Sequence, residues 1–237
     1  MEYAAIVLTA IVVGGMTGSL TNVLATRLPA DGDPPILGLP LRSSTGDEDG
    51  FALVPFAGAW QRDGGGIDWP KLATDIAAAA VVAIALWRHD YGFDALRAAV
   101  FALALLLILR IDWQNHLIFT ITIVPAIVVA LALQAYSSID ELLWSAGAAV
   151  GAGLFFLFLF ILALVIYGKR ALGLGDIWLV TLIGAMTGQA AIAAILLGMF
   201  LAAFGGLFLI LIRVRKRTDY IPYGAYLCLG AIAIVLL

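Results

Sequence analysis

Charged side chains are scarce in this sequence, and cysteine and histidine are scarcer still. Only 12% of the 237 residues are charged, while 63% are hydrophobic, a balance that would leave a soluble domain with too little polar surface. Apolar runs of about 20 residues, the length that a helix needs to cross a bilayer, recur along the chain. The composition therefore predicts a polytopic membrane protein.

The rarity of certain side chains excludes several kinds of site. Cys228 is the only cysteine, which excludes an internal disulfide and any zinc site built from several cysteines. His89 and His116 are too few for a histidine zinc cluster, and no Gly-x-Ser-x-Gly nucleophile elbow occurs. Positive and negative charges are evenly mixed, so no nucleic-acid partner is expected.

The apolar runs are expected to be helices, because a lipid-facing segment must satisfy its own peptide groups and the runs lack the alternation of barrel strands. We predict an all-α fold of about eight transmembrane helices. It has three regions: a first helix (1–28), a cytoplasmic polar loop (29–71) and a seven-helix membrane core (72–237). No Lys or Arg precedes Arg27, so the first run is expected to be a retained span rather than a signal peptide. The predicted spans are 4–24, 72–87, 96–111, 117–135, 142–167, 177–188, 190–212 and 221–237.

The distribution of positive charge predicts the orientation of these spans. With eight spans, 11 of the 13 Lys and Arg residues fall on one side of the membrane, and only Arg88 and Arg97 fall on the other. Because Lys and Arg concentrate on the cytoplasmic side, both termini should face away from the cytoplasm. The sixth span is short, since its length of about 18 Å compares with a hydrocarbon core of about 30 Å. Either this span continues beyond Gln189, or Asp176 lies below the membrane surface.

The polar loop holds much of the negative charge of the chain. Eight of the 16 acidic residues fall between Asp31 and Asp75. A solvated loop with little regular structure is one interpretation. The other is that its acidity recruits a basic substrate segment.

Small and polar residues mark helix faces that should meet protein rather than lipid. In the first span Ser19, Asn22 and Thr26 share one helical stripe. The sequence does not distinguish two roles for this stripe, which are hydrogen bonding between helices and contact with a substrate. GxxxG pairs let helix backbones approach closely, and we expect a packing role for all three that occur. These pairs are Gly14 with Gly18, Gly147 with Gly151, and Gly184 with Gly188.

One carboxylate lies at a membrane boundary between two long apolar runs, in the stretch Gly173-Leu174-Gly175-Asp176. A charge in or beside a membrane segment is costly enough to suggest a functional site with a partner. Asp90 and Asp94 lie in the loop after the second predicted span, and Asp140 and Glu141 lie in the loop after the fourth. All four are predicted on the opposite side of the membrane from Asp176, which excludes them as its partner. Asp219 stands beside a basic run, where a surface salt bridge is expected, and Asp112 lies at the same cytoplasmic boundary as Asp176.

Two roles are open for Asp112 and Asp176. Each is expected to precede a span, and Asp is a favoured N-cap residue, so each could cap a helix. Glycine on both sides of Leu174 would instead let the backbone turn sharply and approach another chain. Two carboxylates held close share a proton. The ionised one can then activate water while the protonated one polarises a peptide carbonyl, which is the chemistry of an aspartic peptidase.

Around these aspartates the chain resembles the bacterial type IV prepilin leader peptidases, membrane aspartic peptidases named for a Gly-x-Gly-Asp motif. The resemblance runs nearly end to end, through five motifs in order. They are Gly18-Ser19 with Asn22-Val23 and Arg27-Leu28-Pro29; Val54-Pro55 with Trp60, Arg62 and Trp69-Pro70; Ile111-Asp112 with Pro125; Gly168-Lys169 with residues 172–176; and Ile221-Pro222-Tyr223-Gly224.

The resemblance implies cleavage of the basic leader from prepilins or pseudopilins, at the cytoplasmic face of the bacterial inner membrane. Asp112 and Asp176 would be the catalytic pair, supported by Gly173 and Gly175. The implied partners are the prepilin substrates and the lipid bilayer, and no oligomeric state is indicated.

The resemblance also bears on the polar residues of the first span and on the cofactors. Ser19, Asn22 and Arg27 would form a polar face with a substrate-binding or structural role. Proteolysis by a carboxylate pair needs no cofactor. Many family members also N-methylate the new terminus with S-adenosylmethionine, and many carry two Cys-x-x-Cys pairs, thought to bind zinc, in the first loop. This loop has no cysteine, so no metal is expected and methylation is left open.

A small transporter, in which the two aspartates carry protons or cations, is the alternative from another class. Inverted repeats would support it, and none is evident in the sequence. Both aspartates are also predicted on one side of the membrane, which suits a cytoplasmic catalytic site better than a conduction path.

Overall fold

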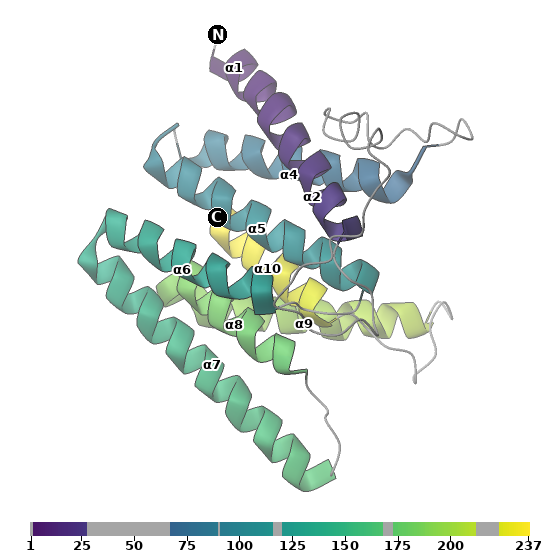
Figure 1. Cartoon of the computed structure of the whole chain (residues 1–237), viewed down its shortest axis with the longest axis vertical. Helices are drawn as coiled ribbons and strands as arrows, with labels where there is room; N and C mark the ends of the chain where they lie inside the picture. The colour runs from purple at the N-terminus through teal and green to yellow at the C-terminus, as the bar shows by residue number, and fades with distance from the viewer. Residues whose placement is uncertain (1, 28–66, 90, 116–119, 168–172, 212–222) are drawn as a thin grey trace. The chain divides into compact units, whose positions relative to one another are not determined.

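The computed structural model describes residues 2–27, 67–89, 91–115, 120–167, 173–211 and 223–237. Within these ranges helices occupy all eight predicted positions, which confirms the all-α fold (Figure 1). Most of the predicted polar loop lies outside the described residues. Four stretches of the described chain are long and apolar enough to cross a membrane: Ile6–Leu24, Trp69–Arg88, Ile139–Ile166 and Leu174–Phe208. The count of eight spans and the side on which the termini lie stay predictions.

The chain forms two compact units, residues 1–115 and residues 116–235. The first unit begins with one continuous helical segment, from α1 (Glu2–Thr9) through the π-helical turn η1 (Ala10–Gly14) to α2 (Gly15–Arg27). It continues with α4 (Trp69–Arg88) and α5 (Phe93–Asn115). Helix α4 packs against both α2 and α5, and α2 also contacts α5. The three helices therefore share one core.

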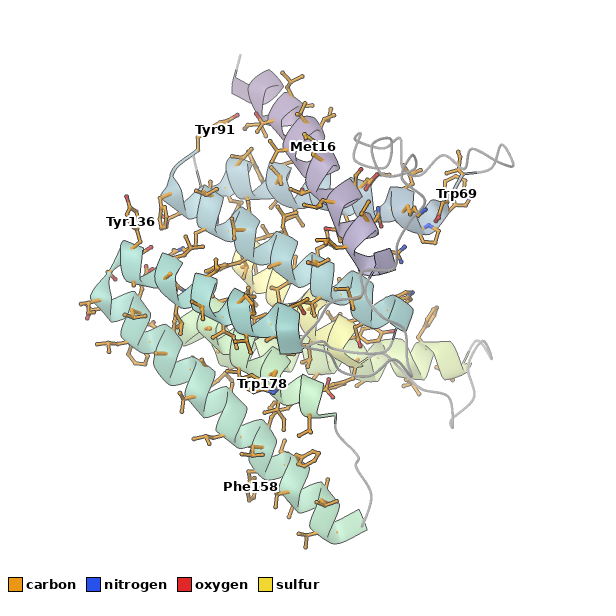
Figure 2. The ribbon with its side chains drawn as sticks, viewed as in Figure 1. Met16, Trp69, Tyr91, Tyr136, Phe158 and Trp178 are labelled. Atoms are coloured by element: carbon orange, nitrogen blue, oxygen red, sulfur yellow. The ribbon has the colours of Figure 1, made fainter. Side chains whose placement is uncertain are left out.

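Helix α4 has the ends and the length of a membrane helix. Asp68 caps its N-terminus by accepting a hydrogen bond from the backbone N–H of Lys71 (3.2 Å). Pro70 lies in the first turn, where its missing N–H costs nothing. Exposed Trp69 (labelled in Figure 2) and Trp87 lie near its two ends, as expected for aromatic side chains at the two membrane interfaces. Its 20 residues rise about 30 Å, the thickness of a hydrocarbon core.

The second unit contains the other predicted spans. They are α6 (Thr120–Ser137), α7 (Ile139–Tyr167), α8 (Leu174–Thr187), the 3-10 turn η3 (Gly188–Ala190), α9 (Ala191–Leu211) and α10 (Tyr223–Leu236). Helix α8 is at its centre, because it packs against α6, α7 and α9 and its Leu179, Val180 and Leu182 are fully buried. Helix α7 instead projects apolar side chains such as Phe158 outward (Figure 2), as a lipid-facing helix does.

The helix at the position of the predicted sixth span is short. Helix α8 has 14 residues and ends at Thr187, so it rises only about 21 Å. Gly188 follows with φ 50°, in the left-handed region that glycine adopts without strain, and starts the turn into α9. The prediction that this helix might continue beyond Gln189 is therefore wrong.

Two of the three glycine pairs pack as predicted. A Cβ on Gly18 would lie 2.6 Å from Cα of Asp75, and a Cβ on Gly184 would lie 2.6 Å from the carbonyl oxygen of Ala148. These glycines therefore allow α2 to approach α4, and α8 to approach α7. A Cβ on Gly147 or Gly151 would meet nothing within 4 Å in the described chain. The predicted packing role is not found for that pair.

This contrast gives a matched pair of stability variants in the contacting helices α7 and α8. Gly184→Ala should lower the free energy of unfolding by about 1–3 kcal/mol, because the added methyl group overpacks the contact with α7. Gly147→Ala should leave it unchanged or raise it slightly, since alanine favours the helix more than glycine does. Thermal unfolding of the purified protein in detergent measures both, and a Gly184→Ala midpoint equal to that of Gly147→Ala would contradict the packing assignment.

Candidate functional site

Asp112 is a buried carboxylate near the C-terminal end of a helix. Helix α5 continues to Asn115, past the predicted end at residue 111, because no glycine or proline stops it there. Asp112 therefore lies in the last turn of α5 and is only 2% exposed, while the next side chain, Trp113, is 52% exposed. The N-cap alternative is wrong for this residue. A carboxylate at this end of a helix also faces the negative end of the helix dipole.

Asp176 occupies the opposite kind of position, in the first turn of α8. Its Oδ2 accepts a hydrogen bond from the backbone N–H of Gly173 (3.2 Å), while its own N–H donates to the Gly173 carbonyl (3.2 Å). The prediction that Asp176 is itself the N-cap residue is wrong, because Gly173 is the N-cap of α8 and Asp176 is the third helical residue, where it supplies the carboxylate half of a capping box. Its side chain is half-buried, and the positive end of the α8 dipole favours its negative charge.

Gly173 does not make the sharp turn that the sequence suggested. Its backbone is extended, with φ −79° and ψ 145°, a conformation open to any residue. A Cβ at this position would lie 3.3 Å from Oδ2 of Asp176. The missing side chain therefore leaves room for the Asp176 carboxylate. Gly175 lies in the first turn of α8.

The second unit also brings two motif segments together. Tyr223, the first residue of α10, interacts electrostatically with the carboxylate of Asp176. The segment 223–224 thus lies near the Gly-x-Gly-Asp stretch, while the preceding Ile221 and Pro222 lie outside the described residues.

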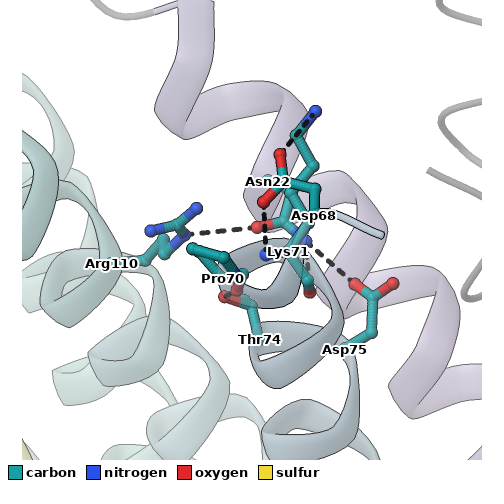
Figure 3. Close-up of polar contacts among 7 residues, drawn as sticks. All are labelled: Asn22, Asp68, Pro70, Lys71, Thr74, Asp75 and Arg110. Atoms are coloured by element: carbon teal, nitrogen blue, oxygen red, sulfur yellow. Dashed lines mark hydrogen bonds and ion pairs between the residues drawn. The ribbon is translucent and has the colours of Figure 1, made fainter. Parts of the chain in front are cut away.

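The polar stripe of the first span makes helix–helix hydrogen bonds. Asn22 Nδ2 donates to Oδ1 of Asp75 (3.0 Å) and to the backbone carbonyl of Lys71 (3.0 Å), and Ser19 Oγ donates to Oδ2 of Asp75 (3.4 Å). Asn22 Oδ1 accepts from Nε of Arg110 (3.3 Å). Figure 3 shows how α2, α4 and α5 meet in this cluster. The side chains of Thr26 and Arg27 lie outside the described residues.

Asp75 and Arg110 are the polar residues that sequence reasoning missed. They are 1% and 7% exposed, respectively. A usable signal was present, because both fall inside predicted spans, and an ionisable residue within an apolar run is a functional-site hypothesis by itself. Their partners come from other helices, which the sequence does not reveal.

No group of three or more His, Cys, Asp or Glu side chains arranged for a metal ion occurs in the part of the chain that the structure describes. Asp112 belongs to the first unit and Asp176 to the second.

The comparisons with known proteins identify the segment that carries both aspartates. Residues 99–211 match the model of the type IV leader peptidase family. No curated protein and no solved structure matches the chain. The matched segment begins in α5, before Asp112, and ends with α9, after Asp176. This segment, just under half of the chain, is therefore similar to the type IV leader peptidases.

Proposed function

We propose that the chain is a membrane aspartic endopeptidase that removes the basic leader from type IV prepilins or pseudopilins, at the cytoplasmic face of the bacterial inner membrane. The family match carries this proposal, because residues 99–211 contain both Asp112 and Asp176. The burial of Asp112 in the last turn of α5 supports it, since capping does not explain that carboxylate. The transporter alternative is not favoured, because the matched family is one of peptidases.

The positions of the two aspartates on their helices suggest which one carries the shared proton. The positive end of α8 and the N–H of Gly173 both stabilise a negative charge on Asp176. Burial and the negative end of α5 both oppose a negative charge on Asp112. In this scheme Asp176 is the ionised base and Asp112 is the protonated acid.

Hydrolysis then needs only these two groups and one water molecule. Asp176 takes a proton from water as the water oxygen attacks the peptide carbonyl carbon, and Asp112 gives its proton to the carbonyl oxygen. When the tetrahedral intermediate collapses, the C–N bond breaks and Asp176 passes its proton to the leaving nitrogen. A hydroxyl proton of the intermediate returns to Asp112, which restores the starting state without a cofactor.

The short α8 agrees with a site just below the membrane surface. A helix of about 21 Å cannot cross a core of about 30 Å from edge to edge. With Asp176 in its first turn, the carboxylate would sit a few ångströms inside the cytoplasmic surface. There it would meet the junction between the basic leader and the apolar stretch of a helical substrate.

The catalytic roles are tested by replacing each carboxylate with its isosteric amide. Asp112→Asn and Asp176→Asn should each reduce cleavage of a purified prepilin by a factor of at least about 1,000, because neither acid–base step survives. Asp140→Asn, which changes an exposed carboxylate in the first turn of α7, is the matched control and should cleave at the wild-type rate. Undiminished cleavage by either of the first two variants, reconstituted and folded, would overturn the assignment.

The division of roles is tested by removing the N–H of Gly173, which donates to the Asp176 carboxylate. Gly173 has a φ that proline can adopt, so Gly173→Pro deletes the hydrogen-bond donor with little change in the backbone. Because the ionised form of Asp176 loses a stabilising contact, the acid limb of the pH profile of kcat/KM should move to higher pH. The alkaline limb should stay in place. Gly173→Ala keeps the N–H and is the control, and movement of the alkaline limb instead would reverse the roles.

The product is tested by co-expressing the protein with a prepilin and analysing the pilin by mass spectrometry. We expect a mature chain that lacks its basic leader, with cleavage at one position next to the apolar stretch. The same spectrum shows whether the new terminus gains the mass of a methyl group, which decides whether S-adenosylmethionine is used. A prepilin recovered at full length beside folded protein would count against the peptidase.

A further inference from the structure

The first unit contains a buried carboxylate that the hydrolysis scheme does not use. Asp75 lies in the second turn of α4, directly before the apolar run 76–87, and is 1% exposed. Burying a carboxylate is costly unless hydrogen bonds and an opposite charge compensate it. A group of this kind within a membrane protein is a candidate for function.

The surroundings of Asp75 are built to hold its carboxylate from both sides. Each of its two oxygens accepts one side-chain hydrogen bond from α2, from Asn22 and from Ser19. The neighbouring Gly18 makes this approach possible, because a Cβ there would lie 2.9 Å from Oδ1 of Asp75. Gly18, Ser19 and Asn22 thus all contribute to the contact between α2 and the Asp75 carboxylate.

Asn22 connects this carboxylate to a buried cation on the third helix. Its amide nitrogen donates to Asp75, and its amide oxygen accepts from Nε of Arg110. The result is a carboxylate–amide–guanidinium chain across α4, α2 and α5 (Figure 3). An amide can join an anion and a cation in this way because it offers both donors and an acceptor.

The cationic end of this chain belongs to the same helical turn as the candidate acid. Arg110 precedes Asp112 by two residues on α5, which puts their Cα atoms about 5 Å apart. Fixing Arg110 therefore fixes the helical turn from which the Asp112 side chain projects. The two side chains leave opposite sides of the helix, so Arg110 acts on Asp112 through the shared turn and through its charge across the helix, where screening by water is poor.

We propose that Asp75 and Asn22 are positioning residues for Asp112, acting through Arg110. They hold the last turns of α5 in place and balance the Arg110 charge, so that Asp112 keeps its proton and its orientation. This rests on the proposed function for its role in the reaction, but the effect on Asp112 itself does not depend on a substrate. Stability alone is a weak reason for such a cluster, because apolar residues often replace buried ionic groups without loss.

The test replaces Asp75 with Asn in the full-length protein. In Asp75→Asn, kcat for prepilin cleavage should fall by about 10- to 100-fold, the size typical for outer partners of an active group, with KM within about twofold. The matched control is Thr74→Val, since Thr74 is the adjacent buried residue on α4 and its hydroxyl bonds only the Pro70 carbonyl of its own helix among the contacts described. Thr74→Val should keep the wild-type kcat.

A rescue variant separates positioning from simple loss of packing. The swap Asn22→Asp with Asp75→Asn keeps one carboxylate and one amide in the same hydrogen-bonded pair, and it moves the carboxylate to the side chain that accepts from Arg110. The swap should recover at least about 10-fold of the lost kcat. If Asp75→Asn does not fold, Arg110→Gln carries the same test, because it removes the cationic end of the chain.

A second readout needs no cleavage at all. Infrared difference spectra, with Asp112→Asn as the reference, follow the titration of the Asp112 carboxyl in the absence of substrate. Asp75→Asn removes one negative charge from the surroundings of Arg110, whose other charged neighbour is Asp68, so the titration of Asp112 should move to lower pH. The other charged groups of described side chains here are Asp68 and Lys71 of α4, paired at 3.3 Å, while Ser19, Thr21 and Asn22 of α2 are uncharged.

The two readouts distinguish failure of this inference from failure of the proposed function. If wild-type protein does not cleave prepilin but Asp75→Asn still moves the Asp112 titration, the positioning role stands and the peptidase proposal fails. A folded Asp75→Asn with wild-type kcat and an unmoved titration overturns the positioning role. So does a loss of kcat that Thr74→Val reproduces.

Discussion

In a chain with so few charges, every charge inside an apolar helix must be compensated by the protein itself, and this constraint orders the polar groups of the structure. Asp75 is held by two side chains of α2, and Arg110 is joined to it through Asn22. Asp176 is held by a backbone N–H at a helix start. The cost of an isolated charge explains why these groups occur in linked sets.

The two candidate catalytic carboxylates show how the same side chain can be given opposite properties. Asp176 lies at the start of a helix, where the dipole and a free N–H favour the ionised form. Asp112 lies at the end of a helix and is shielded from water. Their positions on α8 and α5 therefore favour opposite protonation states. This is an economical way to obtain an acid and a base from two aspartates.

The sequence was sufficient for the helices, because long apolar runs leave no other regular structure in lipid. It failed at helix ends, where α5 runs four residues beyond its predicted end and changes Asp112 from a cap into a last-turn residue. It also failed for Asp75 and Arg110, whose roles depend on contacts between residues far apart in the sequence. The glycine pattern alone could not separate the packed Gly184 from the open Gly147, since both occur in the same motif.

Apolar packing alone does little to select one arrangement of helices in a membrane, because lipid tails cover the same apolar surfaces equally well. Polar contacts and close backbone approach must then supply the specificity. The first unit combines both at one point, where Gly18 lets α4 approach α2 and Asn22 joins Asp75 to Arg110. Because Asn22 donates to the anion and accepts from the cation, its amide has one preferred orientation. That orientation favours one arrangement of the three helices that carry these groups. The buried groups that cost most in lipid are thus the ones that define the geometry around Asp112.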